Sequence, residues 1–160
     1  MLTVRLFCVG RLGEPFWKDA VQEYEKRLSA YCKLERIALP EQKLSPSPSA
    51  NAISAALEKE AAMMNAKRLS NTTTVALCIE GKEMSSEQFA AWLERLTVTG
   101  VSRIDFLVGG SYGLAESIKR QADFRQSLSP MTLPHSLAQI MLLEQLYRAM
   151  NILTGGKYHK

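Results

Sequence analysis

The sequence predicts an α/β fold in which a mostly parallel sheet carries helices on both faces. Short segments rich in Val, Ile, Leu, Phe and Thr alternate along the chain with longer segments of helical periodicity. This alternation is typical of βαβ units, in which a helix connects two parallel strands. Apolar residues make up 46% of the chain and charged residues 22%, as in ordinary globular proteins. With 160 residues, the chain is predicted to form one domain, residues 1–160.

Four segments are predicted to be strands: residues 2–9, 34–39, 73–79 and 104–108. The first follows no basic leader and no cleavage site, so it is interpreted as a strand and not as a signal peptide. The longest apolar runs are too short to cross a bilayer, so no membrane partner is expected.

Five segments have helical spacing: residues 14–30, 53–69, 85–98, 114–126 and 134–154. The third begins with Ser85-Ser86-Glu87-Gln88, which resembles a capping box. The fourth has the weakest pattern. Residues 40–50 contain three prolines and the run Ser45-Pro46-Ser47-Pro48-Ser49, so they are predicted to form an exposed, extended loop.

The three cysteines, Cys8, Cys32 and Cys78, are scattered and include no Cys-x-x-Cys pair. Neither a metal site nor a disulfide framework is therefore predicted. Cys8 and Cys78 fall within apolar strand patterns, which predicts buried thiols in a reducing cytoplasm.

The charge of the chain is mildly positive and evenly spread. The net charge is +4 and the isoelectric point is about 9.0, with basic residues in both halves of the chain. Such a surface permits a nucleic-acid partner, but a solvated surface with a slight positive excess explains the charge equally well.

The turn Gly109-Gly110-Ser111-Tyr112-Gly113 follows a predicted strand and precedes a helix. Open α/β sheets bind ligands at the carboxyl ends of their strands, and glycine lets the backbone approach a ligand closely. The turn is not a dinucleotide-binding fingerprint and has no phosphate-loop lysine. It is therefore compatible with a ligand contact or with a simple tight turn.

The segment Leu128-Ser129-Pro130-Met131-Thr132-Leu133-Pro134-His135 is apolar and stiffened by two prolines. Its backbone and aliphatic side chains suit a flat heterocycle such as adenine. Thr132 is alternatively interpreted as a cap of the following helix, with Pro134 in the first turn.

The last predicted helix carries apolar residues on more than one face, which indicates burial on several sides and a partner subunit. Glu144 and Arg148 have the spacing of an ion pair, although Arg148 could instead bind phosphate. The tail, Lys157-Tyr158-His159-Lys160, offers two cations, a ring for stacking and an imidazole. It is either a frayed terminus or part of a nucleotide-binding site.

Seven motifs in order resemble one known family. They are Gly10 after the first strand; Phe16-Trp17 through Glu23-Tyr24-Glu25-Lys26-Arg27; Leu77-x-x-x-Gly81-Lys82; Gly109-Gly110-Ser111-x-Gly113-Leu114; Met131-Thr132-Leu133-Pro134-His135; Glu144-Gln145-Leu146-Tyr147-Arg148-Ala149; and Tyr158-His159-Lys160. Together they resemble the small SPOUT-class RNA methyltransferases of the RlmH (YbeA) type. Those enzymes methylate N3 of a pseudouridine in 23S ribosomal RNA. The resemblance extends over nearly the whole chain.

The resemblance implies a SPOUT-type fold with a C-terminal trefoil knot, an exception to the usual absence of knots. It also implies a homodimer, a cytoplasmic location, and 23S rRNA in the ribosome or large subunit as substrate. The cofactor would be S-adenosylmethionine, bound by Leu77, Gly109, Gly110, Leu128, Ser129, Pro130, Met131, Thr132 and Leu133. In such dimers, the tail of a partner can complete the site.

The imide nitrogen of a pseudouridine must lose a proton during methylation. The candidates for assisting catalysis are His135, Tyr158 and His159, and the candidates for holding RNA are Arg148, Lys157, Tyr158 and Lys160. For His135, a local hydrogen bond at the helix start is an equally good interpretation. Two other functions stay open: a nucleotide-binding module and a non-catalytic, ribosome-associated α/β module.

Overall fold

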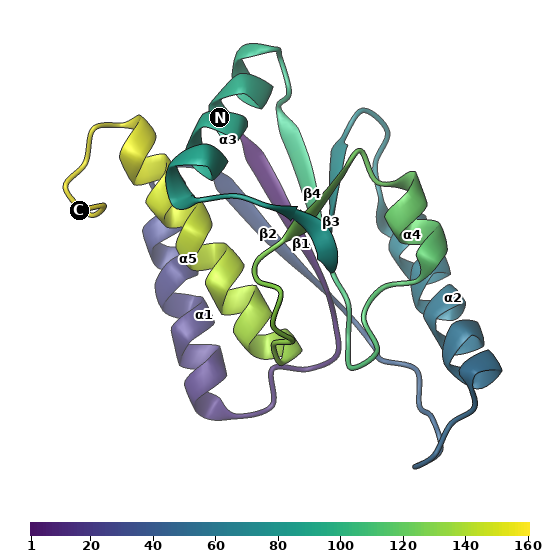
Figure 1. The fold of residues 1–160 in the computed structure, drawn as a ribbon. Coiled ribbons are helices and arrows are strands. Elements are labelled where there is room, and N and C mark those ends of the chain that lie inside the picture. The colour runs from purple at the N-terminus through teal and green to yellow at the C-terminus, as the bar shows by residue number, and fades with distance from the viewer.

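The computed structural model describes residues 1–160 and contains one sheet of five parallel strands between two layers of helices (Figure 1). The strands are β1 (Thr3–Val9), β2 (Lys33–Leu39), β3 (Thr73–Glu83), β4 (Arg103–Val108) and β5 (Phe124–Ser127), in the order β2-β1-β4-β3-β5. Helices α1 (Pro15–Leu28), α3 (Ser86–Val98) and α5 (His135–Leu153) cover one face, and α2 (Ala50–Lys67) and α4 (Glu116–Gln121) cover the other. The predicted α/β class with a parallel sheet is confirmed.

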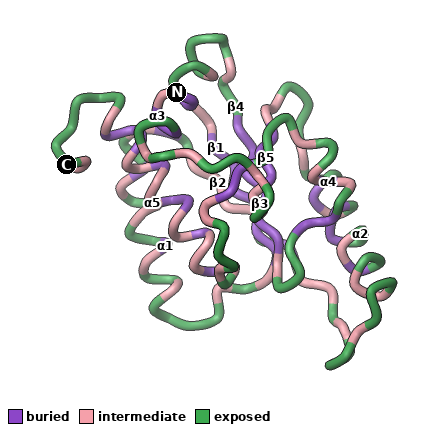
Figure 2. Tube along the Cα trace, viewed as in Figure 1, coloured by how far each residue is buried: buried purple, intermediate pink, exposed green.

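The two central strands, β1 and β4, are buried on both faces (Figure 2). In β1, Val4, Leu6 and Cys8 belong to the apolar cluster under α1, α3 and α5, while Phe7 and Val9 belong to the cluster under α2 and α4. Because side chains alternate between the faces of a strand, a strand buried on both sides needs a continuous apolar run. This explains why both segments were recognisable in the sequence.

One buried ion pair interrupts this apolar interior. Arg5 in β1 and Asp105 in β4 are partners in the parallel register, with 3.1 Å between Arg5 Nε and Asp105 Oδ1. The Arg5 side chain is 4% exposed and the Asp105 side chain is 0% exposed. Arg5 Nη2 also donates to the carbonyl of Lys67 at the end of α2, 2.8 Å away. Burial raises the pKa of Asp105, and the guanidinium of Arg5 opposes that shift.

The predicted helix over residues 114–126 is wrong in its second half. Helix α4 ends at Gln121, Ala122 is extended, and Phe124–Ser127 form the edge strand β5 beside β3. Asp123 stabilises this change of direction, because its Oδ2 accepts a hydrogen bond from the backbone N–H of Thr74 at 2.7 Å. Strand β5 depends on its pairing with β3 and has little strand pattern of its own.

Strand β3 continues to Glu83 instead of ending near residue 79. Its pairing with β5 shifts register between Leu77 and Lys82. A Cβ atom at Gly81 would lie only 2.6 Å from the carbonyl carbon of Gln126. Gly81 therefore allows the two backbones to approach where the register changes.

The remaining local predictions have mixed outcomes. The capping box of α3 is confirmed: Ser85 Oγ accepts from Gln88 N at 3.2 Å, and Gln88 Oε1 accepts from Ser85 N at 2.9 Å. Residues 40–49 form no helix or strand, as predicted, and Ser49 caps α2.

The three cysteines are all free. Cys8 is buried, and burial raises the pKa of its thiol to about 12. Cys78 is only half-buried, contrary to the prediction. None of the helices combines the length and apolar character needed to span a bilayer.

Candidate active site

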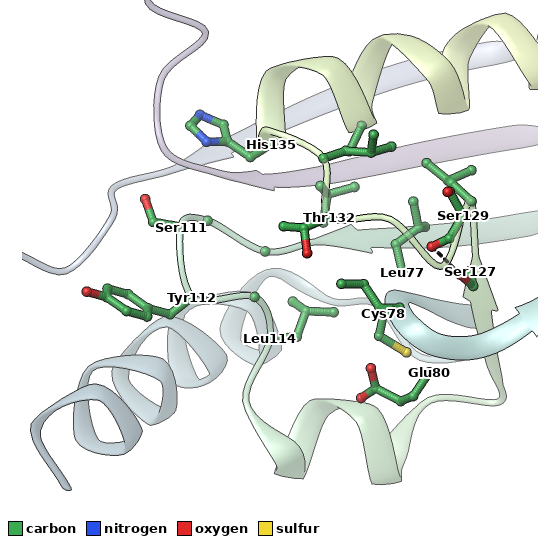
Figure 3. Close-up of a pocket in the computed structure, with 18 of the residues that line it drawn as sticks. Leu77, Cys78, Glu80, Ser111, Tyr112, Leu114, Ser127, Ser129, Thr132 and His135 are labelled. Carbon is green, nitrogen blue, oxygen red and sulfur yellow. Dashed lines mark hydrogen bonds between the residues drawn. The ribbon is translucent and has the colours of Figure 1, made fainter. Parts of the chain in front are cut away.

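A cavity of about 360 Å³ lies at the carboxyl ends of β4 and β5, beside the middle of β3 (Figure 3). Most of its lining comes from three chain segments: residues 77–80 of β3, residues 108–114 from the end of β4, and residues 127–129 and 131–133 from the end of β5. Figure 3 shows Leu77, Leu114 and Thr132 around the same space. Its size and its mixture of apolar side chains with backbone polar groups suit a small organic ligand. The carboxyl edge of the sheet is where an open α/β fold is expected to bind one.

The glycine turn at residues 109–113 forms one wall of this cavity. The backbone N–H of Gly113 donates to the carbonyl of Gly110 at 3.1 Å, and Gly113 has a positive φ of 78°. A Cβ atom at Gly109 would collide with the carbonyl group of Gly113. Position 109 thus requires glycine because no side chain fits there, and position 113 favours glycine because its φ is positive.

We expect Gly109→Ala to weaken cofactor binding by about tenfold or more, because an overpacked site costs about 1–3 kcal/mol when its backbone must shift. Isothermal titration calorimetry would measure the effect. Gly100→Ala is a suitable control: Gly100 has a φ of 94° but no atom within 4 Å of an added Cβ. The control should lower the melting temperature and leave cofactor affinity unchanged; similar losses of affinity in both variants would contradict the prediction.

The loop after β5 forms the opposite wall. Ser127 Oγ donates to the carbonyl of Ser129 at 2.9 Å, and Ser129 Oγ accepts from the backbone N–H of Met131 at 3.0 Å. Met131 is 74% exposed although it lines the cavity, so its side chain is available to cover a ligand. The loop is thus held in shape by its own serines as well as by its prolines.

Eight of the nine predicted cofactor residues line this single cavity: Leu77, Gly109, Gly110, Leu128, Ser129, Met131, Thr132 and Leu133. The ninth, Pro130, is exposed and does not line it. The sequence missed Cys78, Glu80 and Lys119, which also line the cavity. Lys119 of α4 pairs with Glu80 of β3 at 2.6 Å, a contact that no sequence spacing could indicate.

His135 lies at the rim of the cavity, as the first residue of α5. Its Nε2 is 2.9 Å from the carbonyl oxygen of Arg11, in the loop after β1. Because a carbonyl only accepts, Nε2 carries the hydrogen and Nδ1 is the acceptor nitrogen of the neutral ring. Figure 3 shows the ring directed away from Leu77 and Cys78.

The predicted cap by Thr132 is wrong, because the N-cap position of α5 is Pro134 and no side chain caps this helix.

The C-terminal tail packs against the second half of α5. Tyr158 donates from its hydroxyl to Glu144 Oε1 at 3.0 Å, and the guanidinium of Arg148 lies 4.6 Å from the centre of the Tyr158 ring. Arg148 also pairs with Glu144 at 2.7 Å, so the predicted ion pair is present. Burial, followed by the hydrogen bond to Glu144, raises the pKa of Tyr158 to about 12, so its hydroxyl is protonated at neutral pH.

His159 uses both of its ring nitrogens within the chain. Its Nδ1 is 3.2 Å from Arg148 Nη1, which can only donate, and its Nε2 is 2.9 Å from Glu87 Oε1. The neutral ring therefore carries its hydrogen on Nε2 and donates it to Glu87. The pKa of Glu87 is lowered to about 2, first by its own backbone N–H and then by Ser85 and His159. Lys157 and Lys160 are exposed and form no ion pair.

The structure does not bring the tail and the cavity of one chain together. His135 begins α5 at the cavity, whereas Tyr158 and His159 follow its other end (Figure 1). The tail folds back onto α5, where Tyr158 bonds to Glu144, nine residues or ~13 Å along the helix from His135 at ~1.5 Å per residue, and none of residues 157–160 lines the cavity. Of the three predicted catalytic residues, only His135 therefore lies at the cavity of its own chain. No group of three or more His, Cys, Asp or Glu side chains is arranged to hold a metal ion.

Comparison with known proteins shows the family of the chain. Residues 2–159 match the model of a family described as predicted SPOUT methyltransferase. The chain is 40% identical over 159 residues to ribosomal RNA large subunit methyltransferase H 1 of Clostridium perfringens, with 99% of this chain and 100% of the relative covered. It is 42% identical, with the same coverage, to ribosomal RNA large subunit methyltransferase H of Clostridium acetobutylicum.

Two solved structures share the fold at low sequence identity. A probable methyltransferase from Bordetella pertussis superposes with a TM-score of 0.55 at 15% identity, covering 92% of this chain and 95% of the other. A probable methylase family protein from Haemophilus influenzae gives a TM-score of 0.53 at 10% identity, covering 99% of this chain and 70% of the other. The match to the family model over almost the entire length shows that the chain belongs to the SPOUT methyltransferase family.

Proposed function

We propose that the protein transfers a methyl group from S-adenosylmethionine to N3 of a pseudouridine in 23S ribosomal RNA, within the ribosome or the large subunit. The observation that carries the proposal is the cavity at the carboxyl ends of β4 and β5, in a chain about 40% identical to relatives named as large-subunit rRNA methyltransferases. Such a substrate places the protein in the cytoplasm.

The residues of the cavity fit S-adenosylmethionine. Leu77, Leu128 and Leu133 offer apolar contacts for the adenine ring, and the backbone of residues 109–113 comes close enough for polar contacts because Gly109 and Gly110 have no side chains. When bound, the sulfonium supplies an electrophilic methyl group, so the protein mainly has to align donor and acceptor.

We further propose a homodimer in which the tail of one chain completes the cavity of the other. The tail of a single chain is anchored to Glu144 and Arg148 of α5 and lines no part of its own cavity, so a second copy is needed to bring Tyr158, His159 and Arg148 to the substrate. The half-buried apolar residues of α5, among them Leu137, Ile140 and Met141, support an interface on this helix. Arg148, Lys157 and Lys160 would hold the RNA phosphates in such a site.

The knot implied by the family is part of this proposal. The chain leaves the edge strand β5, passes along the cavity beside the glycine turn, and enters α5 between α1 and α3 (Figure 1). This route supports threading of the C-terminal segment past the loop after β4.

The proton on N3 must be removed as the methyl group is transferred. Tyr158 is a poor base because its pKa is raised to about 12, and His159 has both nitrogens occupied by Arg148 and Glu87 in the single chain. We assign proton removal to Nδ1 of His159 once Arg148 releases it, or to the free Nδ1 of His135. The protonated Tyr158 would then donate to the substrate.

The direct test is incubation of the purified protein with labelled S-adenosylmethionine and, in parallel, ribosomes, large subunits and protein-free 23S rRNA, followed by mapping of the modified nucleotide. Label at N3 of one pseudouridine is the expected result. Binding of ribosomes without any transfer would instead support a non-catalytic, ribosome-associated protein. Preference for adenine mononucleotides over S-adenosylmethionine would support a nucleotide-binding module.

A further inference from the structure

The side chain of Glu41 reaches the glycine turn from the loop between β2 and α2. Its Oε1 accepts a hydrogen bond from the backbone N–H of Ser111 at 2.8 Å, across 70 residues of sequence. A Cβ atom at Gly110 would lie 2.7 Å from the same oxygen, and one at Gly10 would lie 3.4 Å from Oε2. The carboxylate is therefore packed against two glycine backbones, and Gly110 and Ser111 both line the cofactor cavity.

The segment that carries Glu41 is held in place from its other side. The backbone N–H of the next residue, Gln42, donates to Glu60 Oε2 in α2 at 3.1 Å. Glu60 is 5% exposed, so this contact is shielded from water. Prolines at positions 40, 46 and 48 further restrict the loop. The backbone that carries Glu41 is thus anchored beside the glycine turn, with the carboxylate within hydrogen-bond distance of Ser111.

We propose that Glu41 is a positioning residue of the methyltransferase, which sets the shape of the cofactor cavity by holding the Ser111 N–H and the backbone of Gly110. This proposal rests on the proposed function, because it concerns the binding of S-adenosylmethionine. It gives the loop at residues 40–49 a role: the loop supports the glycine turn from outside, whereas the segment after β5 faces the ligand directly.

For this positioning role, Glu41 must supply an acceptor oxygen to the backbone N–H of Ser111. The negative charge of the carboxylate is a separate property that could attract the sulfonium. The two effects are separable, because S-adenosylhomocysteine has nearly the shape of S-adenosylmethionine and lacks the positive charge. A positioning effect weakens the binding of both ligands equally, whereas an effect of charge weakens only the binding of S-adenosylmethionine.

The test measures the Kd of both ligands by calorimetry for the wild-type protein, Glu41→Ala and Glu41→Gln. Loss of a hydrogen bond to a charged group is expected to weaken binding of both ligands by about tenfold in Glu41→Ala. Glu41→Gln retains an acceptor oxygen and should bind both within about twofold of wild type. Amide hydrogen exchange at Ser111 should be slow in the wild-type protein and in Glu41→Gln, and fast in Glu41→Ala.

Glu58→Ala is the matched control. Glu58 in α2 resembles Glu41 because its carboxylate accepts a hydrogen bond from a distant segment, from Ser117 Oγ at 2.9 Å. Neither Glu58 nor Ser117 lines the cavity. This variant should bind both ligands normally. Wild-type affinity in folded Glu41→Ala, or equal losses in Glu41→Gln and Glu41→Ala, would overturn the proposal. If Glu41→Ala does not fold, Glu41→Met, which keeps the size of the side chain and lacks the acceptor oxygen, takes its place with the same expected loss of binding. A wild-type protein that binds neither ligand would refute the proposed function itself.

Discussion

Deletion of residues 157–160 is expected to lower methyl transfer by about 10²-fold to 10⁴-fold or more, which is the usual contribution of positioned acid–base groups. Tyr158 and His159 are removed by the deletion, together with the cations of Lys157 and Lys160. The fold should persist, because α5 ends at Leu153 and the deleted residues do not belong to either apolar core. Single-turnover methylation of ribosomes would measure the loss, and calorimetry should show unchanged affinity for S-adenosylmethionine.

Mixing variants tests whether the tail acts on the cavity of the partner. A tail-deleted chain keeps its cavity, and a Gly109→Ala chain keeps its tail while its cavity is impaired. Random mixing of two chains in a symmetric dimer should restore about a quarter of the wild-type sites, since half of the dimers are mixed and each has one competent pair. No recovery on mixing would place the tail and cavity in the same chain. Full activity of the truncated protein would refute a catalytic role for the tail.

Asp105→Ala is expected to destabilise the protein by about 3–5 kcal/mol, the usual cost of leaving one member of a buried ion pair without its partner. The guanidinium of Arg5 is 4% exposed and would keep only the carbonyl of Lys67 as an acceptor. Urea unfolding followed by circular dichroism would measure the change.

Glu23→Ala is a control for Asp105→Ala. Glu23 pairs with Arg27 at 2.8 Å, but both side chains are exposed, at 50% and 39%, respectively. The loss of such a surface pair should change the free energy of unfolding by less than about 1 kcal/mol. A similarly small change in Asp105→Ala would mean that the surrounding sheet or water compensates for the loss of the carboxylate.

Elements with their own apolar pattern were predicted well. The bounds of β1, β2 and β4 differ from the predicted segments by one residue at most. For β1 and β4 the reason is that strands buried on both faces of a parallel sheet need long apolar runs, whereas β2 is an edge strand in which only Leu39 is buried. Strand β5 was missed because Phe124-Arg125-Gln126-Ser127 is short and mostly polar, and it pairs only where β3 is already in place. The extension of β3 beyond residue 79 depends on the same partner, through the close approach at Gly81.

The components of the cavity were predictable, but their arrangement was not. The loop at residues 128–133 was interpreted as a ligand-binding segment from its composition, whereas the glycine turn was by itself equally compatible with a simple tight turn. Their meeting depends on the strand order β4-β3-β5, which places the carboxyl ends of β4 and β5 on either side of β3. The contacts of Lys119 with Glu80 and of Glu41 with Ser111 join residues 39 and 70 positions apart, respectively, and leave no signal in spacing.

The sequence by itself determined the α/β class, the segments that can hold a cofactor and the family to which the chain is similar, because these depend on local periodicity and short motifs. Only the tertiary structure decided which of those segments share a cavity, that Pro130 lies outside it, and that the tail of one chain folds back onto the second half of α5 and does not line it. The reason is physical: a sheet brings together the ends of strands distant in sequence, whereas a rigid helix of 19 residues keeps its two ends apart.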